Sequence, residues 1–329
     1  MPGLSLRRLN RSKLKALMLL ALASVSSGCS SPAAATGLND PPGTPGSTGT
    51  ASDAALTPYF VTPALCADNS GPDCTRLRLG NSDLSTTAPA VGKLFSCVAG
   101  NASAPGSIAS KITWIDFAGD RWNLLRKPFL PAKAGATPGT IAVTDPSGTR
   151  TIQTNNLPVD AKLGDWPMTQ YAALTAIDPN PGTPAARVVN YTFASPGTVA
   201  AAPTCVGMGA IGVTLNGVVL YNAVDARGND AVANEIVDVY GGHPAQTDYH
   251  YHSVPERLDA APGADGHSGI IGYIRDGLPI YGYHGVGGAE LTNSDLDVCH
   301  GHSHGTLGYH YHATMEYPYT IGCYRGTPR

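Results

Sequence analysis

Apolar and polar residues alternate in several short stretches of the chain, the pattern of β-strands that bury one face. The stretch KITWIDFAGDRWNLL (111–125) alternates on both sides of Gly119-Asp120, and TIAVTDPSGTRTIQTNN (140–156) does so around Pro146-Ser147-Gly148. Both predict hairpins. The segment ARVVNYTFAS (186–195) is β-branched and aromatic and predicts a further strand.

Two segments sixty residues apart share one pattern. IGVTLNGVVLYN (211–222) and IGYIRDGLPIYG (271–282) align without gaps, and each has an Asn-Gly or Asp-Gly pair between apolar runs, a strong hairpin signal. Further on, DVYGGHPAQTDYHYH (238–252) matches DVCHGHSHGTLGYHYH (297–312), with one residue inserted in the second copy. The pattern predicts an internal two-fold repeat, with units at about 209–257 and 269–323.

The first unit also predicts a short helix before its YHYH motif. Asn229 can cap this helix, one face carries Val232, Ile236 and Val239, and Gly241-Gly242 would end it. The second unit has NSDLDVCHG there, which predicts a turn at most. The expected fold class is mainly β (β-rich α+β), built from antiparallel hairpins with an internal two-fold repeat and one or two short helices.

Composition agrees with this fold class. The 39 glycines and 27 prolines make up about a fifth of the 329 residues, which disfavours long helices. With 42% hydrophobic and 14% charged residues, the chain can bury a sizeable core.

The N-terminus predicts export. Four basic residues precede the apolar run LKALMLLALASV (14–25) and a fifth, Lys15, lies at its start; the run is too short for a permanent membrane span. The run ends in VSSGCS, which resembles a bacterial lipoprotein signal with Cys29 as the lipidated residue, although Ser26 stands where that signal usually has Leu. The alternative is a plain secretory signal. We expect a signal peptide at 1–28 and a disordered Pro/Gly/Ser/Thr linker at 29–57.

Cysteine usage supports export. Six cysteines remain after Cys29, an even number that suggests disulfides in an exported chain, and Cys299 with Cys323 is the expected pair because the two bracket the second YHYH motif. Without residues 1–28 the chain has 16 basic and 24 acidic residues, a net charge of −8. No nucleic-acid partner is expected, and the membrane is a partner only through a lipid anchor.

All ten histidines lie between His243 and His312. In an extended YHYH segment both histidines point to one face, with their Cα atoms about 6.6 Å apart, so His-x-His can supply two ligands to one metal ion. The candidate metal ligands are His243, His250, His252, His300, His302, His304, His310 and His312. One possibility is that the two YHYH segments face each other across a pseudo-two-fold axis and share a site. Asp238 and Asp297, with Tyr249 and Tyr309, are the expected outer partners of the ligands.

Other interpretations remain open. Partly buried histidines often only hydrogen-bond to backbone or carboxylates, with the tyrosines on the core face. NSDLD (293–297) resembles the start of a calcium loop, but Val298 stands where such a loop needs Gly. DGHSG (265–269) contains Asp, His and Ser, and we interpret it as a loop.

The segments GHPAQTDYHYH, IGYIRDGLPIYG and GYHYHATMEYPYTIGCYRG closely resemble the bacterial YHYH-domain family of exported proteins. The resemblance covers about residues 110–325. It implies a domain type, and no reaction comes with it. Relatives often have Cys before Gly-Gly-His, where this chain has Tyr240, so a disulfide is not expected there.

We therefore expect a Cys-containing segment at 58–107 and a YHYH domain at 108–329, in an outer-membrane or cell-envelope lipoprotein. The leading hypothesis is a domain that binds copper or zinc. The alternatives are an envelope metalloenzyme with an open coordination position, and a metal-free module that recognises a glycan or an envelope protein.

Overall fold

The computed structural model describes residues 51–67, 71–259 and 262–329. The expected signal peptide, the lipidation residue Cys29 and most of the expected linker lie outside these residues. The last residues of that linker differ from the expectation, because Ala51–Leu56 form helix α1. Leu56 is only 2% exposed, so burial of its side chain holds this end of the segment on the domain.

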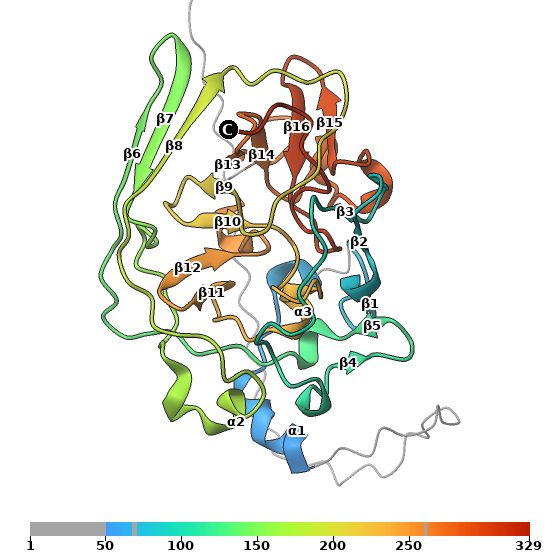
Figure 1. Cartoon of the computed structure of the whole chain (residues 1–329), viewed down its shortest axis with the longest axis vertical. Helices are drawn as coiled ribbons and strands as arrows, with labels where there is room; N and C mark the ends of the chain where they lie inside the picture. The colour runs from blue at the N-terminus through green and yellow to red at the C-terminus, as the bar shows by residue number, and fades with distance from the viewer. Residues whose placement is uncertain (1–50, 68–70, 260–261) are drawn as a thin grey trace, which may run out of the picture. The chain divides into compact units, whose positions relative to one another are not determined.

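The centre of the fold is an eight-stranded sheet with the order β11-β12-β10-β9-β13-β14-β16-β15 (Figure 1). Its strands are β9 (Ala210–Thr214), β10 (Val219–Tyr221), β11 (Gly242–Ala245), β12 (Asp248–Tyr251), β13 (Ile270–Ile274), β14 (Pro279–Tyr281), β15 (Gly301–His304) and β16 (Gly308–His312). We call β9 to β12 the first half of the sheet and β13 to β16 the second half.

Strand pairing is the same in both halves. β10 runs parallel to β12 with Leu220 opposite Tyr251, and β14 runs parallel to β16 with Ile280 opposite Tyr311. In the middle, antiparallel β9 and β13 pair Gly212 with Ile274 and Thr214 with Gly272. A duplicated unit would give such pairing, and a common origin of the halves stays a prediction.

The two hairpins that the Asn-Gly and Asp-Gly pairs predict are confirmed. Antiparallel β9 and β10 flank Gly217, and antiparallel β13 and β14 flank Gly277. Both glycines have positive φ angles, 92° and 83°, which this turn requires and which glycine adopts without strain.

The other predicted strands are also present, together with three short strands (β1, β2 and β3) that the sequence pattern does not predict. β4 (Ile115–Asp116) and β5 (Arg121–Trp122) form a short hairpin that β1 (Leu77–Arg78) extends. β6 (Ile141–Thr144) pairs antiparallel with β7 (Gly148–Thr154), which pairs with β8 (Val189–Ser195). β2 (Leu84–Ser85) pairs parallel with β3 (Leu94–Phe95). The mainly β prediction is confirmed.

The predicted helix of the first half is shorter than expected. It is α3 (Ala231–Asn234), and its cap is Asp230, whose side chain accepts a hydrogen bond from Ala233 N, in place of Asn229. The chain becomes extended at Glu235 and leaves the helix there. The other helical segments are α2 (Ala172–Thr175) and the 3₁₀ turns Thr57–Tyr59, Ala64–Cys66, Gly80–Ser82, Ala109–Lys111, Leu124–Arg126, Met168–Gln170, Glu256–Leu258, Val286–Gly288 and Asn293–Asp295.

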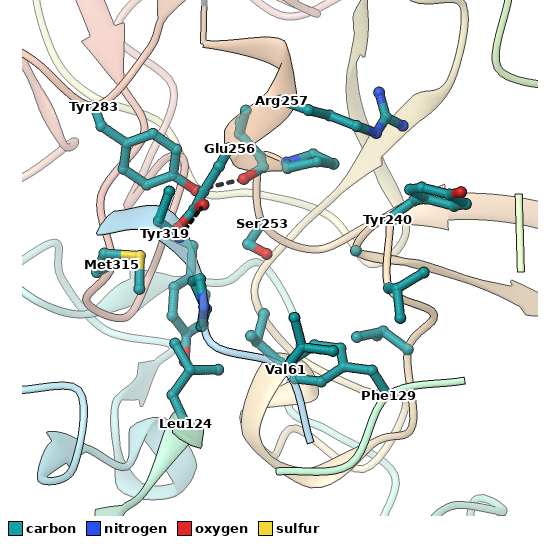
Figure 2. Close-up of a pocket in the computed structure, with 18 of the residues that line it drawn as sticks. Val61, Leu124, Phe129, Tyr240, Ser253, Glu256, Arg257, Tyr283, Met315 and Tyr319 are labelled. Atoms are coloured by element: carbon teal, nitrogen blue, oxygen red, sulfur yellow. Dashed lines mark hydrogen bonds between the residues drawn. The ribbon is translucent and has the colours of Figure 1, made fainter. Parts of the chain in front are cut away.

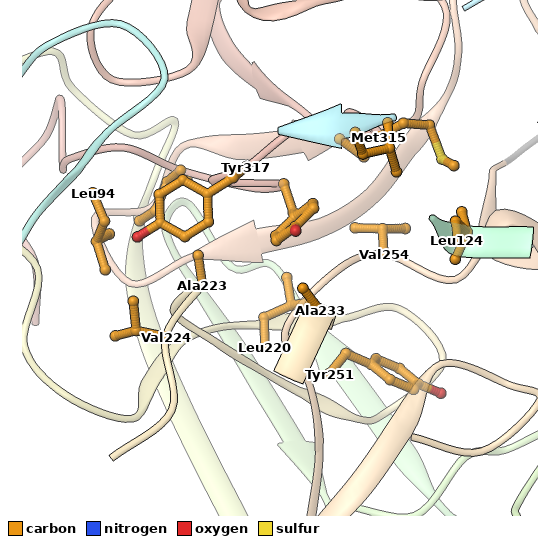
Figure 3. Packing of buried hydrophobic residues seen from close by; sticks show 14 of the residues in the cluster. Leu94, Leu124, Leu220, Ala223, Val224, Ala233, Tyr251, Val254, Met315 and Tyr317 are labelled. Atoms are coloured by element: carbon orange, nitrogen blue, oxygen red, sulfur yellow. The ribbon is translucent and has the colours of Figure 1, made fainter. Parts of the chain in front are cut away.

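One large hydrophobic cluster joins the sheet to the N-terminal segment. Leu220 and Tyr251 of the sheet pack in it with Ala233 of α3, and Leu94 of the N-terminal segment and Tyr317 lie in the same cluster (Figure 3). Residues 58–107 therefore contribute to the same core as the sheet.

Three disulfides link the described cysteines: Cys66–Cys74, Cys97–Cys205 and Cys299–Cys323. The last is the pair expected around the second YHYH motif. The described residues contain no helix that is long and apolar enough to cross a membrane.

Candidate metal centres

In both YHYH motifs the tyrosines and histidines point to opposite faces. Tyr249 and Tyr251 are fully buried in the core, and their hydroxyls bond to polar groups there. The expected partnership of Asp238 with a histidine is not what the structure shows. Asp238 accepts hydrogen bonds from the Tyr249 hydroxyl (2.8 Å) and the Trp166 indole (3.2 Å). Asp297 likewise accepts from the Tyr309 hydroxyl at 3.0 Å. These pairs fix the strands and leave the histidine rings to other partners.

The histidines form two groups, one in each half of the sheet. Four strands separate β12 from β16, so the two motifs lie about 24 Å apart along the sheet. The arrangement with one shared site is therefore wrong. The second-half cluster is His267, His302, His310 and His312, and the first-half cluster is His243, His250 and His252.

In the second-half cluster the ring nitrogens converge. His310 Nε2 lies 3.2 Å from His267 Nε2 and 3.1 Å from His302 Nε2, and His312 Nε2 lies 3.2 Å from His267 Nε2. In a tetrahedral zinc site with Zn–N bonds of 2.0–2.1 Å, neighbouring nitrogens are about 3.3 Å apart. These three spacings, with all four ligand atoms within 4.8 Å of one another, fit one small metal ion.

The opposite ring nitrogens identify the tautomer. His267 Nδ1 lies 2.8 Å from the Ser268 carbonyl oxygen, His310 Nδ1 lies 2.9 Å from Gly308 O, and His312 Nδ1 lies 2.7 Å from Gly282 O. A carbonyl only accepts, so each Nδ1 carries the hydrogen, and in a neutral ring Nε2 then has only a lone pair. His267 Nε2 therefore faces two other lone pairs, which a cation between them would satisfy.

A proton is a poor substitute for that cation. Burial lowers the pKa of His310 to about 4 and that of His312 to about 2, so both rings are neutral at pH 7. Neutral imidazole is the form that binds a metal ion.

The first-half cluster repeats this arrangement with three histidines. His250 Nδ1 lies 2.8 Å from Asp248 O, His252 Nδ1 lies 2.5 Å from Asn222 O, and the two Nε2 atoms are 3.1 Å apart. His243, paired with His250 across the β11–β12 hairpin, completes the group. Burial lowers the pKa of His252 to about 4 and holds the pKa values of His243 and His250 well below the usual range.

A carboxylate adjoins the first-half cluster. Glu235 Oε2 lies 3.3 Å from His243 Nε2 and 3.9 Å from His252 Nε2. Among the described residues, His243 Nε2 is buried without a hydrogen-bond partner. Burial, together with Asp178 and Asp225, raises the pKa of Glu235 well above its usual range.

A cavity of about 410 Å³ opens beside the first-half cluster, and its walls include all three histidines and Glu235. A second cavity, of about 280 Å³, lies elsewhere between Val61, Phe129, Tyr240 and Met315 (Figure 2). None of the clustered histidines lines this second cavity, and its Glu256 carboxylate is bonded to the backbone N–H groups of Ala64 and Leu65. Of these two cavities, the one of about 410 Å³ therefore gives access to the candidate metal ligands.

Two sequence-predicted ligands lie outside both clusters. His300 is 3% exposed, and its Nδ1 lies 2.9 Å from His312 O and 3.0 Å from Thr320 O, so it joins backbone segments. His304 stacks on His267 with ring centroids 5.5 Å apart but does not belong to the group of converging nitrogens.

Sequence reasoning missed His267 and Glu235. The DGHSG pattern predicts only a loop around His267, and a position three residues before β13 gives no periodic signal. It also missed Tyr221, whose ring stacks on His250 at 3.8 Å between centroids, and its counterpart Tyr281 beside His310.

These buried histidine clusters define a candidate metalloprotein. The profile of a family described as YHYH protein matches residues 190–290. The chain therefore contains a YHYH domain, as the resemblance predicted. The match covers the first half of the sheet and the β13–β14 hairpin, and it ends before the second YHYH motif. No curated protein and no solved structure matches the chain.

Proposed function

We propose that this domain binds two transition-metal ions, one in each histidine cluster. Two observations together carry the proposal. In both clusters, Nε2 atoms of neighbouring histidines point at one another at 3.1–3.2 Å. The Nδ1 atoms of five of these rings are hydrogen-bonded to backbone carbonyls. Orienting a ligand histidine through its other nitrogen is a general feature of metal sites.

The donor set favours copper or zinc. Imidazole nitrogen suits zinc, copper and nickel, whereas calcium and magnesium take oxygen ligands. Four imidazoles at tetrahedral spacing suit zinc, and copper binds most tightly among the divalent ions.

We propose further that the protein works outside the cytoplasm, anchored through a lipid on Cys29. The three disulfides support export, because such bonds persist in oxidising compartments. Metal held at the cell envelope would serve sequestration, delivery or sensing.

Metal content of site variants tests the proposal. The full exported chain, without an affinity tag of histidines, is dialysed against zinc and separately against copper, and metal per chain is measured. We expect about two ions in the parent, one in His310→Ala/His312→Ala and one in His250→Ala/His252→Ala. The control His300→Asn changes a histidine outside both clusters and should keep both ions.

Absence of bound metal from the parent after reloading would exclude the proposal. The YHYH surface would then be a structural or recognition element. Retained binding of a glycan or envelope protein after exhaustive chelation would support that reading.

A further inference from the structure

The two halves of the sheet differ at one ligand position. His267, the fourth histidine of the second half, precedes β13 by three residues, and Gly207 precedes β9 by the same three residues. The backbone corresponds there: Asn222 N donates to Gly209 O at 3.1 Å, and Gly282 N donates to Gly269 O at 3.3 Å, sixty residues on. The first half therefore has a residue without a side chain where the second half has its fourth imidazole.

Space remains at this position. A Cβ atom added to Gly207 would meet no other atom within 4 Å, and its φ is not in the left-handed region. The cavity of about 410 Å³ adjoins the three histidines. Three protein ligands with a free fourth position are the pattern of metal sites that exchange a ligand, whereas four ligands close a site.

Glu235 lies beside this position without filling it. A fourth tetrahedral ligand would be about 3.3 Å from all three nitrogens. Glu235 Oε2 lies at that distance from His243 Nε2 only. Among the described residues, the first-half group whose ligand atoms all lie within 4.8 Å of one another consists of the three histidines and does not include Glu235. Counting back from the shared Asp-Val pair, the second half has Ser294 at this position, so the carboxylate is specific to the first half.

We infer that the metal ion of the first-half cluster keeps one coordination position open to the cavity and binds there a small protic oxygen donor, which donates a hydrogen bond to Glu235. The inference rests on the metal binding proposed above. Water is the smallest such ligand, and the cavity has room for a small hydroxamic acid or alcohol. The second-half cluster, with four imidazoles, holds its ion closed.

Cobalt substitution tests this difference between the halves. Co²⁺ is loaded into the full chain, into His310→Ala/His312→Ala, which keeps the first-half cluster, and into His250→Ala/His252→Ala, which keeps the second. Azide, a small ligand that coordinates open positions, is added while the visible d–d bands are recorded. We expect azide to change the bands of the protein that keeps the first-half cluster. In the parent, which holds one cobalt ion in each cluster, azide should change about half of the cobalt signal. The protein that keeps only the second-half cluster should not respond.

Two further variants, made in the protein that keeps the first-half cluster, address the open position and Glu235. Gly207→His supplies the missing imidazole and should abolish the response to azide. Glu235→Gln should weaken binding of acetohydroxamic acid about tenfold or more, because an amide NH2 group, which cannot accept a hydrogen bond, replaces one of the two carboxyl oxygens. Azide, which has no hydrogen to donate, should bind as well or better.

The outcomes separate the two proposals. If cobalt binds to the first-half cluster and azide leaves its bands unchanged, the open position is refuted and metal binding stands. If cobalt does not bind to the first-half cluster in the parent or in the variant that keeps it, metal binding by this cluster and its open position are both refuted. If Glu235→Gln weakens azide and acetohydroxamic acid equally, or releases the metal, Glu235 is a metal ligand and its proposed role is wrong.

Discussion

Replacing His300 by asparagine should make the protein less sensitive to acid. His300 is 3% exposed, and burial lowers its pKa to about 4, against about 6.5 in an unfolded chain. Between these values the unfolded chain binds a proton that the folded protein excludes, so stability falls as the pH falls from 6.5 towards 4. Asparagine tolerates the positive φ of 72° at this position.

The size of the effect follows from the two pKa values. Because the unfolded chain binds this proton more tightly, titration of His300 should lower the free energy of unfolding by about 2.5 kcal/mol between pH 7 and pH 4.5. Other buried groups titrate in the same window. Burial raises the pKa of Asp230 to about 6, which acts in the opposite direction because the folded protein then binds the proton more readily. The difference between parent and variant isolates His300.

Urea unfolding of the chelator-treated protein measures this difference. The free energy of unfolding of the parent and of His300→Asn is determined at pH 8, 7, 5.5 and 4.5. The loss between pH 7 and 4.5 should be smaller in the variant by about 2.5 kcal/mol. Between pH 8 and 7 the two proteins should change alike, which separates the effect from a general loss of stability. Equal losses from pH 7 to 4.5 would refute the reasoning.

Three other substitutions test the surroundings of the sites. Replacing Cys97 and Cys205 by serine opens a loop of 108 residues and should lower the free energy of unfolding by about 4 kcal/mol in urea, and an unchanged midpoint would contradict this. Asp238→Ala should lower it by more than about 3 kcal/mol, because several buried donors lose their acceptor. Lys127→Met leaves the Glu235 carbonyl without its ammonium donor. Lys127→Met is therefore combined with each of the two cluster variants, and zinc binding is measured by dialysis. Zinc binding should weaken in the protein that keeps the first-half cluster and stay unchanged in the protein that keeps the second.

Local structure was largely predictable from the sequence. The alternation in 140–156 and the Asn-Gly and Asp-Gly pairs fix hairpins, because turn geometry and side-chain direction are set within a few residues. The same period of two explains why the YHYH tyrosines lie in the core while the histidines share the other face.

The arrangement of the sites was not predictable in the same way. The separation of the clusters depends on the pairing of β9 with β13, which places both YHYH strands toward the outside of the sheet. His267 reaches His310 and His312 from a loop more than forty residues away in sequence. Glu235 adjoins His243 because the helix ends after Asn234, earlier than its apolar pattern indicates.

Anomalous X-ray diffraction from crystals of the full exported chain grown with zinc or copper is the most direct test of metal binding by both clusters. Data collected on either side of the absorption edge of the metal should show two peaks, each about 2.0–2.1 Å from the converging Nε2 atoms of one cluster. Crystals that diffract well and show no anomalous peak at either cluster would contradict the account.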